Sequence, residues 1–199
     1  MIETASPDSS TAAYLRQATK QEHHLTEKTL SSAKIMRSDL SRSEYACLLQ
    51  TNYAMWATAA ETVLSDGVTK LWPYHPLAVR LKEAAREDLL ALGEQLPAIN
   101  QALPSHADQA SKMGIAYVLL GSGLGAGMMI SRLRKCPELQ GLDVFRFYSA
   151  SGALTMKEWQ AFRGLLDDAV KIEEDRARAL SAANETFRSF RSCYSLNTK

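Results

Sequence analysis

One histidine near the start of the chain has a carboxylate one helical turn away. His23 and Glu27 are four residues apart, so a helix would place both side chains on one face. An imidazole that binds a metal usually gives its second N–H to a carboxylate or a carbonyl, which fixes the tautomer and the ring orientation. The pair therefore indicates a candidate metal ligand with an orienting partner. On spacing alone, a solvated His/Glu pair on a helix surface is the more common arrangement.

A run of glycines in an apolar segment is the second candidate. Four glycines lie between Tyr117 and Met129, and each glycine inside a helix costs about 1 kcal/mol relative to alanine. Gly121 and Gly125 would share one helix face, where the absence of side chains lets the backbone lie close to a flat group. Glycines in mid-helix also permit a kink. Close packing of two helices would explain the same residues.

The same run satisfies, in form, the Gly-x-Gly-x-x-Ala fingerprint of dinucleotide-binding folds, from Gly121 to Ala126. That fingerprint works at the turn between a strand and a helix in a βαβ unit. The sequence has no second hydrophobic strand and no pattern typical of a parallel sheet. We therefore reject the dinucleotide interpretation.

The elements that would position these residues are predicted to be helices. Helical periodicity and capping residues predict five of them, over residues 9–30, 41–65, 77–92, 105–135 and 156–191, with a proline-containing loop over 72–76. Ser41 with Glu44 and Thr155 with Glu158 have the spacing of capping boxes. We predict an all-α single domain over residues 12–191, preceded by a flexible N-terminus over 1–11 and followed by a C-terminal tail over 192–199.

Composition narrows the classes of function. The chain has 199 residues, of which 46% are hydrophobic, and a net charge of +1, so no overall field attracts nucleic acid or an anionic membrane. The three cysteines match no zinc or redox spacing. Residues 1–12 do not resemble a signal peptide, and the apolar stretch 113–130 contains glycines and is interpreted as a core helix rather than a membrane span. We expect a cytoplasmic protein.

Together, the two segments resemble the heme oxygenase family, especially its bacterial members. Leu15-Arg-x-Ala-Thr-Lys-x-x-His23 with Glu27 is similar to the first helix of that family, and Gly121-Ser-x-Leu-Gly-Ala126 is similar to its distal helix. The likeness covers about residues 12–191. It implies a multi-helix bundle in which heme lies between the first helix and a kinked glycine-rich distal helix.

The resemblance also implies roles for individual residues. His23, rather than His24, corresponds to the iron ligand because Ala18-Thr-Lys sets the register, and Glu27 corresponds to its carboxylate partner. The positions on the oxygen side of the heme are Gly121, Ser122 and Gly125. The remaining contacts implied for heme are Arg16 and Tyr117 near a propionate, Ala126 and Arg132 along the distal helix, and Phe187 as a wall.

The implied activity is the oxygen-dependent cleavage of heme b, both substrate and cofactor, to biliverdin, ferrous iron and carbon monoxide. Electrons would come from a reductase or a ferredoxin-like protein, and a bilin-binding photoreceptor is a downstream partner that the family suggests. No nucleic-acid or membrane partner is expected.

Two residues depart from the family pattern. Ser122 replaces an aspartate of the mammalian-type members, and Ala126 replaces a glycine. These departures motivate one alternative, a non-catalytic heme carrier of the same fold. A second alternative is a helical domain of related architecture with an unrelated small-molecule activity, because such folds host several chemistries. Gln50, Asn52 and Tyr53 are candidates to hold the distal water.

Overall fold

The computed structural model describes residues 10–65, 70–99, 102–103 and 108–197. Within these residues the chain forms helices and no strand, which confirms the predicted all-α class. The helices are α1 Thr11–Ala18, α2 Lys20–Thr29, α3 Ser32–Arg37, α4 Arg42–Thr58, α5 His75–Ala91, α6 Gln109–Ser122, α7 Ala126–Leu133, α8 Arg146–Ser151, α9 Met156–Ala169 and α10 Glu173–Asn197. A π-helical turn, η1 Ala59–Val63, extends α4, and 3-10 turns form η2 Trp72–Tyr74, η3 Gly123–Gly125 and η4 Pro137–Leu139.

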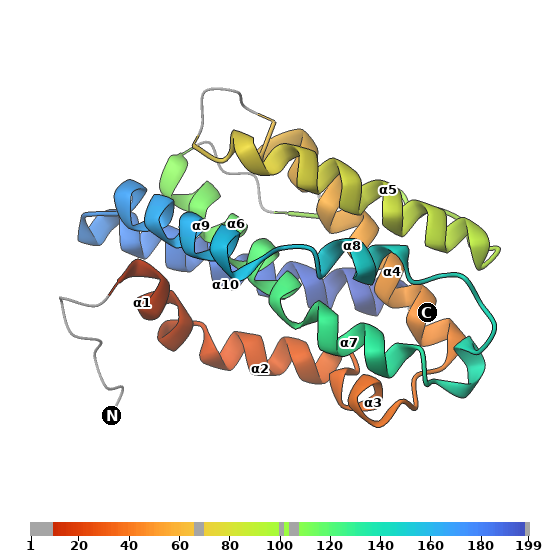
Figure 1. Cartoon of the computed structure of the whole chain (residues 1–199). Helices are drawn as coiled ribbons and strands as arrows, with labels where there is room; N and C mark the ends of the chain where they lie inside the picture. The colour runs from red at the N-terminus through yellow and green to blue at the C-terminus, as the bar shows by residue number, and fades with distance from the viewer. Residues whose placement is uncertain (1–9, 66–69, 100–101, 104–107, 198–199) are drawn as a thin grey trace.

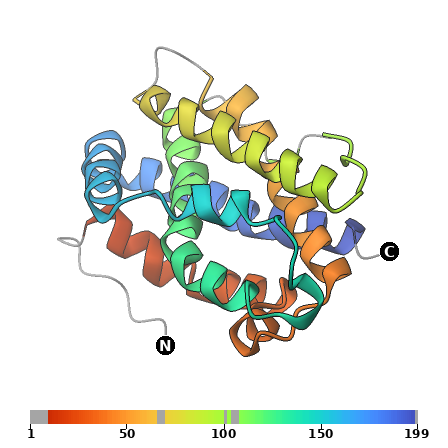
Figure 2. The same ribbon diagram turned by 45° about the vertical axis from the view of Figure 1, so that its right-hand side comes forward.

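The longest helix, α10, joins the two sides of the bundle. It packs against α6, α4, α2 and α1, whereas α5 packs against α4 and α8. Figure 1 shows α10 along the middle of the molecule, with α4 and α5 on one side and α1 and α2 on the other. The turned view in Figure 2 shows the same arrangement. The first and last described helices are therefore neighbours in space.

The core is centred on α4, whose residues from Tyr45 to Thr58 are all buried except Gln50. A helix that is buried on all sides has no polar face to present to water, as expected for the central helix of a bundle. The largest fully buried side chains come from this helix and from its neighbours; they include Trp56, Tyr45, Phe162, Leu15, Ile35 and Met55.

Both predicted capping boxes are confirmed. The hydroxyl of Ser41 accepts from the backbone N–H of Glu44 at 3.2 Å, and the backbone N–H of Ser41 donates to Glu44 Oε2 at 3.0 Å. Thr155 and Glu158 make the same reciprocal pair at the start of α9. These local bonds satisfy N–H groups that have no partner within the helix, so the starts of α4 and α9 were readable from sequence.

The single helix predicted over residues 156–191 is wrong. The chain leaves helical geometry at Val170, where φ is −124° and ψ is 79°, and this break separates α9 from α10. The break is held from outside, because the hydroxyl of Thr11 donates to the carbonyl oxygen of Val170 at 3.1 Å. The C-terminal helix then continues to Asn197, whose carbonyl oxygen accepts from Cys47 Sγ.

Other elements also differ from the prediction. The helix expected over 9–30 is interrupted at Thr19, between α1 and α2. The loop expected over 72–76 is wrong, since this stretch forms η2 and the start of α5. Pro76 lies in the first turn of α5, where its missing N–H is not needed. The helices α3 and α8 were not predicted.

The fold explains why α8 forms. The buried carboxylate of Asp88, on α5, accepts from the backbone N–H groups of Arg146 at 3.1 Å and Phe147 at 2.9 Å. Burial raises the pKa of Asp88, although these hydrogen bonds and the charge of Arg146 oppose the rise. A carboxylate 58 residues away in the chain thus caps this short helix.

The glycine run interrupts the long helix as predicted. The first part, α6, ends at Ser122, the 3-10 turn η3 follows, and α7 begins at Ala126. The beginning predicted at residue 105 lies outside the described residues. By length and composition the span Gln109–Leu133 could cross a membrane, with a mean hydropathy of 1.7, but half of its most apolar window is buried within the bundle. This burial agrees with the core-helix interpretation.

Candidate active site

The imidazole of His23 is oriented on one side and free on the other. Its Nδ1 lies 3.6 Å from Glu27 Oε2, and the ring meets Phe187 of α10 edge to face, with centroids 5.6 Å apart. The side chain is 57% exposed. Within the part of the chain that the structure describes, no hydrogen bond involves Nε2. An imidazole needs a fixed ring orientation and an open nitrogen to bind a metal that enters from outside the protein. His24, although exposed on the same helix, has no such carboxylate or ring contact among the described residues.

The four glycines of the run form two pairs along the chain. Gly123 and Gly127 make up one pair, and a Cβ at Gly123 would lie 3.1 Å from the carbonyl oxygen of Ser151. The backbone nitrogen of Gly127 lies 3.5 Å from the position that a Cβ on Gly152 would take, but a Cβ on Gly127 itself would meet no atom within 4 Å. Close helix packing therefore accounts for Gly123 and does not require a glycine at Gly127.

Gly121 and Gly125 make up the other pair. A Cβ at Gly125 would meet no atom within 4 Å, and the nearest atom at Gly121 is Cη2 of Trp159, at 3.6 Å. No protein neighbour therefore requires the absence of a side chain at Gly125. The exposed apolar side chains of Leu124 and Met128 lie beside it in the chain. A flat apolar group could approach the backbone here.

Ser122 lies on the same turn as this open backbone and is exposed. Its hydroxyl donates to the carbonyl oxygen of Leu119 at 2.7 Å. The proton of the hydroxyl is thereby used, and its lone pairs remain available to accept a hydrogen bond from water. Ala126, by contrast, is buried at the start of α7.

Two cations and a phenol meet at another edge of the site. Tyr117 of α6 is half-buried, and burial raises its pKa, whereas the positive charges of Arg16 from α1 and Arg163 from α9 oppose that rise. The ring of Tyr117 packs against Trp159, with centroids 5.8 Å apart. Both arginines are exposed, so their charges are available to an anionic group.

Comparisons with known proteins identify the family. The sequence model of the family described as heme oxygenase matches residues 75–195 of this chain. This chain belongs to the heme oxygenase family. The matched segment includes the glycine run, Trp159, Arg163 and Phe187, whereas His23 lies before it. The predicted family and enzyme class, a heme-degrading oxidoreductase, are confirmed.

Individual heme oxygenases match most of the chain. The enzyme of Xanthomonas campestris pv. campestris (strain 8004) is 29% identical over 153 residues, which are 75% of this chain and 87% of that protein. The heme oxygenase structure from Leptospira interrogans has a TM-score of 0.73 at 20% identity and covers 94% of this chain and 100% of its own. Heme oxygenase-1 of Synechocystis sp. PCC6803, solved in complex with heme, has a TM-score of 0.72 at 16% identity, with 94% and 92% covered. At these identities the structural likeness shows the heme oxygenase fold.

The residues present fit heme, the group that the family binds. Heme needs an axial base, small residues against one face, apolar surroundings and cations for its two carboxylates. His23 has an open Nε2, Gly125 has open space beside its backbone, and Arg16 with Arg163 offers positive charge. Figures 1 and 2 show α7 running beside α2, and α3, which follows α2 in the chain, contacts α7.

Arg163 is a candidate site residue that sequence reasoning missed. It lies four residues after Trp159 on α9, so both share the face that meets Tyr117. That spacing was the available signal. The assignment of Arg132 stays a prediction: it is exposed on the last turn of α7, and in the described chain no ion pair joins it to Arg16, Tyr117 or Arg163.

The three candidates for holding distal water differ in their surroundings. The amide of Asn52 is buried and donates to the carbonyl oxygen of Leu48 at 2.8 Å. Tyr53 is buried and Gln50 is half-buried on the same helix. Trp56, one turn after Asn52, has a buried Nε1 without a hydrogen-bond partner among the described residues. These positions stay predictions.

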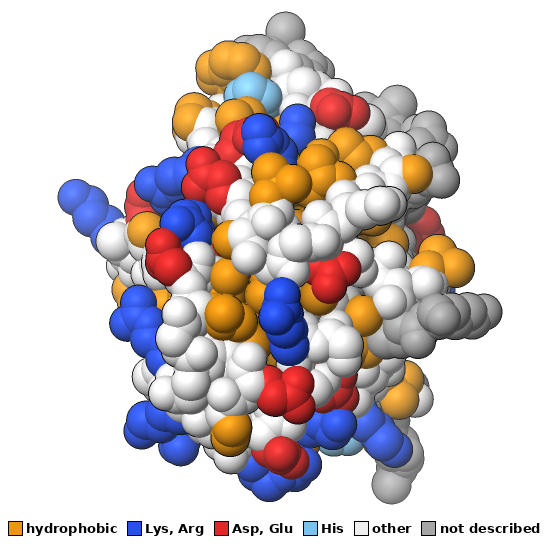
Figure 3. Space-filling model, turned by 90° about the vertical axis from the view of Figure 1, so that its right-hand side faces the viewer, with side chains coloured by type: hydrophobic (Ala, Val, Ile, Leu, Met, Phe, Trp, Pro, Cys, Tyr) orange, Lys and Arg blue, Asp and Glu red, His pale blue; other side chains and the backbone are white. Residues whose placement is uncertain are grey.

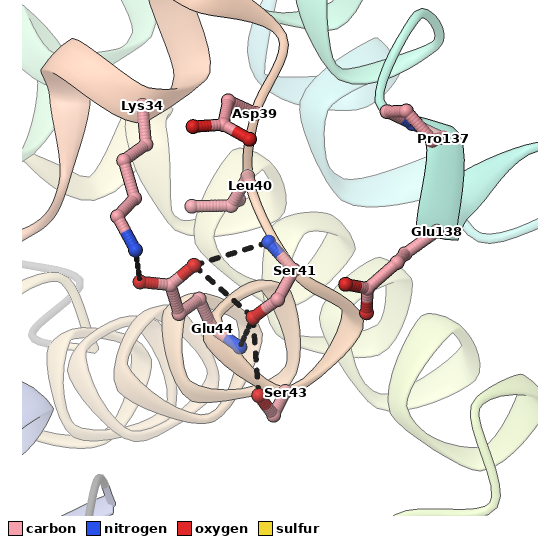
Figure 4. Close-up of a pocket in the computed structure, with 8 residues that line it drawn as sticks. All are labelled: Lys34, Asp39, Leu40, Ser41, Ser43, Glu44, Pro137 and Glu138. Carbon is pink, nitrogen blue, oxygen red and sulfur yellow. Dashed lines mark hydrogen bonds and ion pairs between the residues drawn. The ribbon is translucent and has the colours of Figure 1, made fainter.

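A separate pocket of about 530 Å³ lies where α3 and α4 approach η4. Figure 4 shows that its wall is the capping box of α4, with Glu44 joined to Lys34 at 2.6 Å. None of the predicted site residues lines it. Across the neighbouring face of the molecule in Figure 3, basic and acidic side chains are intermixed, as the net charge of +1 suggests.

Proposed function

We propose that this chain cleaves heme to biliverdin, ferrous iron and carbon monoxide, with oxygen and with electrons from a reductase or a ferredoxin-like protein. The observation that supports this most is the pairing of an oriented histidine having an open Nε2 with a glycine backbone that no protein atom covers. When bound, heme supplies the redox-active iron and the porphyrin ring that is opened. The chain itself supplies binding, orientation and access for water.

His23 is proposed as the residue that would bind the heme iron, through Nε2. Glu27 Oε2 faces Nδ1 at 3.6 Å, and a closer approach would hold the N–H on that side and leave the lone pair on Nε2. The edge of Phe187 limits rotation of the ring. The carboxylate also makes the imidazole a stronger donor to iron.

On the opposite face, the open backbone at Gly125 and Gly121 lets the ring plane approach the helix, and it leaves little room above the iron. Ser122 accepts a hydrogen bond from water there, since its own proton is given to the carbonyl of Leu119. Ser122 therefore orients a water molecule but does not itself act as an acid. Neutral donors and water can carry protons in this site without a charged distal side chain.

The heme propionates are proposed to lie against Arg16, Arg163 and the hydroxyl of Tyr117. Two arginines and a phenol suit two carboxylates, because guanidinium groups bind carboxylates with paired hydrogen bonds. Their placement on α1, α9 and α6 would fix the rotation of heme in its plane and so select the carbon at which the ring opens. A cytoplasmic location, heme b as the form bound and a bilin-binding photoreceptor downstream stay predictions.

The direct test adds hemin to the purified chain and then ascorbate or a reductase in air. We expect a Soret band that decays while biliverdin absorbance appears. A stable Soret band would favour the alternative of a heme carrier, which the absence of an acid at Ser122 motivates. The lack of any Soret band would contradict both functions.

The ligand assignment has a matched pair of variants. His23→Ala should abolish the axial imidazole signal, because it removes the only side chain proposed to reach iron from α2. His24→Ala is the control on the adjacent residue and should leave the heme spectrum unchanged. The reverse result would show that the register of α2 is wrong.

A further inference from the structure

The helix that carries His23 has almost no apolar contact with the rest of the molecule. Of the ten residues of α2, Thr26 is the one that is buried, and the leucine of this helix, Leu25, is 40% exposed. A surface helix normally owes its position to a stripe of buried apolar side chains. Because α2 lacks that stripe, another interaction must hold it on α10.

Polar contacts around Glu22 hold α2. Arg191 of α10 donates from Nη2 to Glu22 Oε2 at 2.5 Å and from Nη1 to the carbonyl oxygen of Glu22 at 3.2 Å. The same Nη1 donates to Thr26 Oγ1 at 2.8 Å. Arg188, one turn earlier on α10, donates from Nε and Nη2 to Glu22 Oε1 at 3.3 and 3.2 Å. We call Glu22, Thr26, Arg188 and Arg191 the α2 clamp.

The clamp differs from an ordinary surface ion pair. The side chains of Glu22 and Arg191 are only 19% and 20% exposed, so water and salt screen this contact less than an exposed pair. Each oxygen of the carboxylate has its own guanidinium partner. Burial acts to raise the pKa of Glu22, but the hydrogen bonds and charges of Arg191 and Arg188 outweigh it and hold the pKa below its ordinary range.

The clamp also adjoins the imidazole. Glu22 immediately precedes His23. Thr26 Oγ1 donates to the carbonyl oxygen of Glu22 at 2.8 Å and lies 3.3 Å from the carbonyl oxygen of Phe187. The ring of that same Phe187 meets the ring of His23. A shift of α2 along α10 would therefore move the imidazole and its carboxylate partner together, and it would change the contact of the imidazole with Phe187.

We propose that Glu22, Arg191 and Arg188 are positioning residues that set where His23 Nε2 stands, and so the strength of the bond from imidazole to heme iron. This inference rests on the proposed function, in which His23 binds that iron. The arginines do not touch heme in this role. They act through the backbone of α2, and Arg191 contributes more than Arg188 because it is less exposed and contacts both the backbone and Thr26.

The test uses the full chain with the substitutions Arg191→Gln, Glu22→Gln and the two combined. Each single variant should weaken hemin binding about tenfold and shift or broaden the iron–histidine stretching band in the resonance Raman spectrum of the ferrous protein. Without heme, amide hydrogens of residues 20–29 should exchange about tenfold faster. The double variant should weaken hemin binding by less than the product of the two single effects, because both substitutions remove the same contact between Glu22 and Arg191.

Arg178→Gln is the matched control. Arg178 also lies on α10 and pairs with Asp175 and Asp108, away from α2, so hemin affinity and the band should stay unchanged. The effect of Arg188→Gln on hemin affinity and on the iron–histidine band should fall between the effects of Arg178→Gln and Arg191→Gln. If Arg191→Gln does not fold, Arg191→Lys and Glu22→Gln carry the test, since lysine keeps the charge but cannot reproduce the fork of donors.

Two results would overturn the proposal in distinguishable ways. If His23→Ala removes the iron–histidine band but the clamp variants leave band and amide exchange unchanged, the clamp does not position the ligand. If the band survives His23→Ala, the ligand assignment itself fails, and this inference fails with it.

Discussion

Both α2 and α6 pack against α10, but through opposite chemistry. The contact of α6 is apolar and tight: its backbone comes so close that a Cβ on Gly114 would lie 2.1 Å from the carbonyl oxygen of Ala179. The contact of α2 is polar and made by arginine side chains. The glycine-rich side of the proposed heme site is thus fixed by close packing. The histidine side is held by a few charged hydrogen bonds.

Two glycines of the segment from α6 to η3 show the same difference. Gly114 and Gly125 lie eleven residues apart, yet one is pressed against backbone and the other faces open space. Glycine at the first position serves the fold. At the second position no protein contact requires a glycine. We therefore expect Gly125 to leave space for the group that the site binds.

The largest effect is expected for Gly114→Ala. The added methyl group would clash with backbone atoms that cannot rotate away, so the free energy of unfolding of the heme-free protein should fall by about 3 kcal/mol. Urea denaturation measures this loss. A loss below about 1 kcal/mol would mean that the α6–α10 contact is much looser than the structure shows.

Gly125→Ala should act in the opposite direction on the empty protein. The methyl group meets no atom within 4 Å, and alanine restricts the unfolded chain, so stability should rise by about 0.5 to 1 kcal/mol. Hemin affinity should nevertheless fall by about tenfold, since the methyl group would occupy the space beside the ring. Thermal unfolding and Soret titration measure the two effects. A variant that binds hemin as tightly as the parent protein would remove Gly125 from the site.

Acid should weaken the anchoring of α2 before that of α6, by about 1 kcal/mol. The pKa of Glu22 is lowered in the folded protein, below its ordinary value of 4.5. A group of this kind contributes stability above its unfolded pKa and loses it as the pH falls through its folded pKa. The protection of the amides of α2, measured against their intrinsic exchange rates, should therefore fall below about pH 4.5, before the protection of residues 113–120 of α6 does. Simultaneous loss of protection in both segments would argue against independent anchoring.

Local signals in the sequence were sufficient for the parts of the fold that local bonds determine. The capping boxes at Ser41 and Thr155 mark the starts of α4 and α9, and the glycines mark the interruption between α6 and α7. The parts that failed depend on distant partners. The break at Val170 is bonded by Thr11, and α8 is capped by Asp88, so neither could be read from the residues around it.

The candidate site shows the same division. His23, Glu27 and the glycine run are recognisable because their spacing within one helix already relates them to one another. Arg163 and the α2 clamp were missed, since their significance arises only when α9 and α10 fold back beside α6 and α2. Charged residues on long amphipathic helices otherwise look like ordinary solvated positions.

The clamp also has a consequence for the order in which the protein becomes functional during synthesis. Glu22 lies 166 residues before Arg188 and 169 residues before Arg191. The histidine helix therefore leaves the ribosome long before the arginines that hold it. At translation rates of about 5–20 residues per second, that interval is on the order of ten to thirty seconds. During this time α2 has no apolar stripe with which to dock elsewhere on the growing chain. The histidine side of the proposed heme site is therefore among the last parts to be assembled.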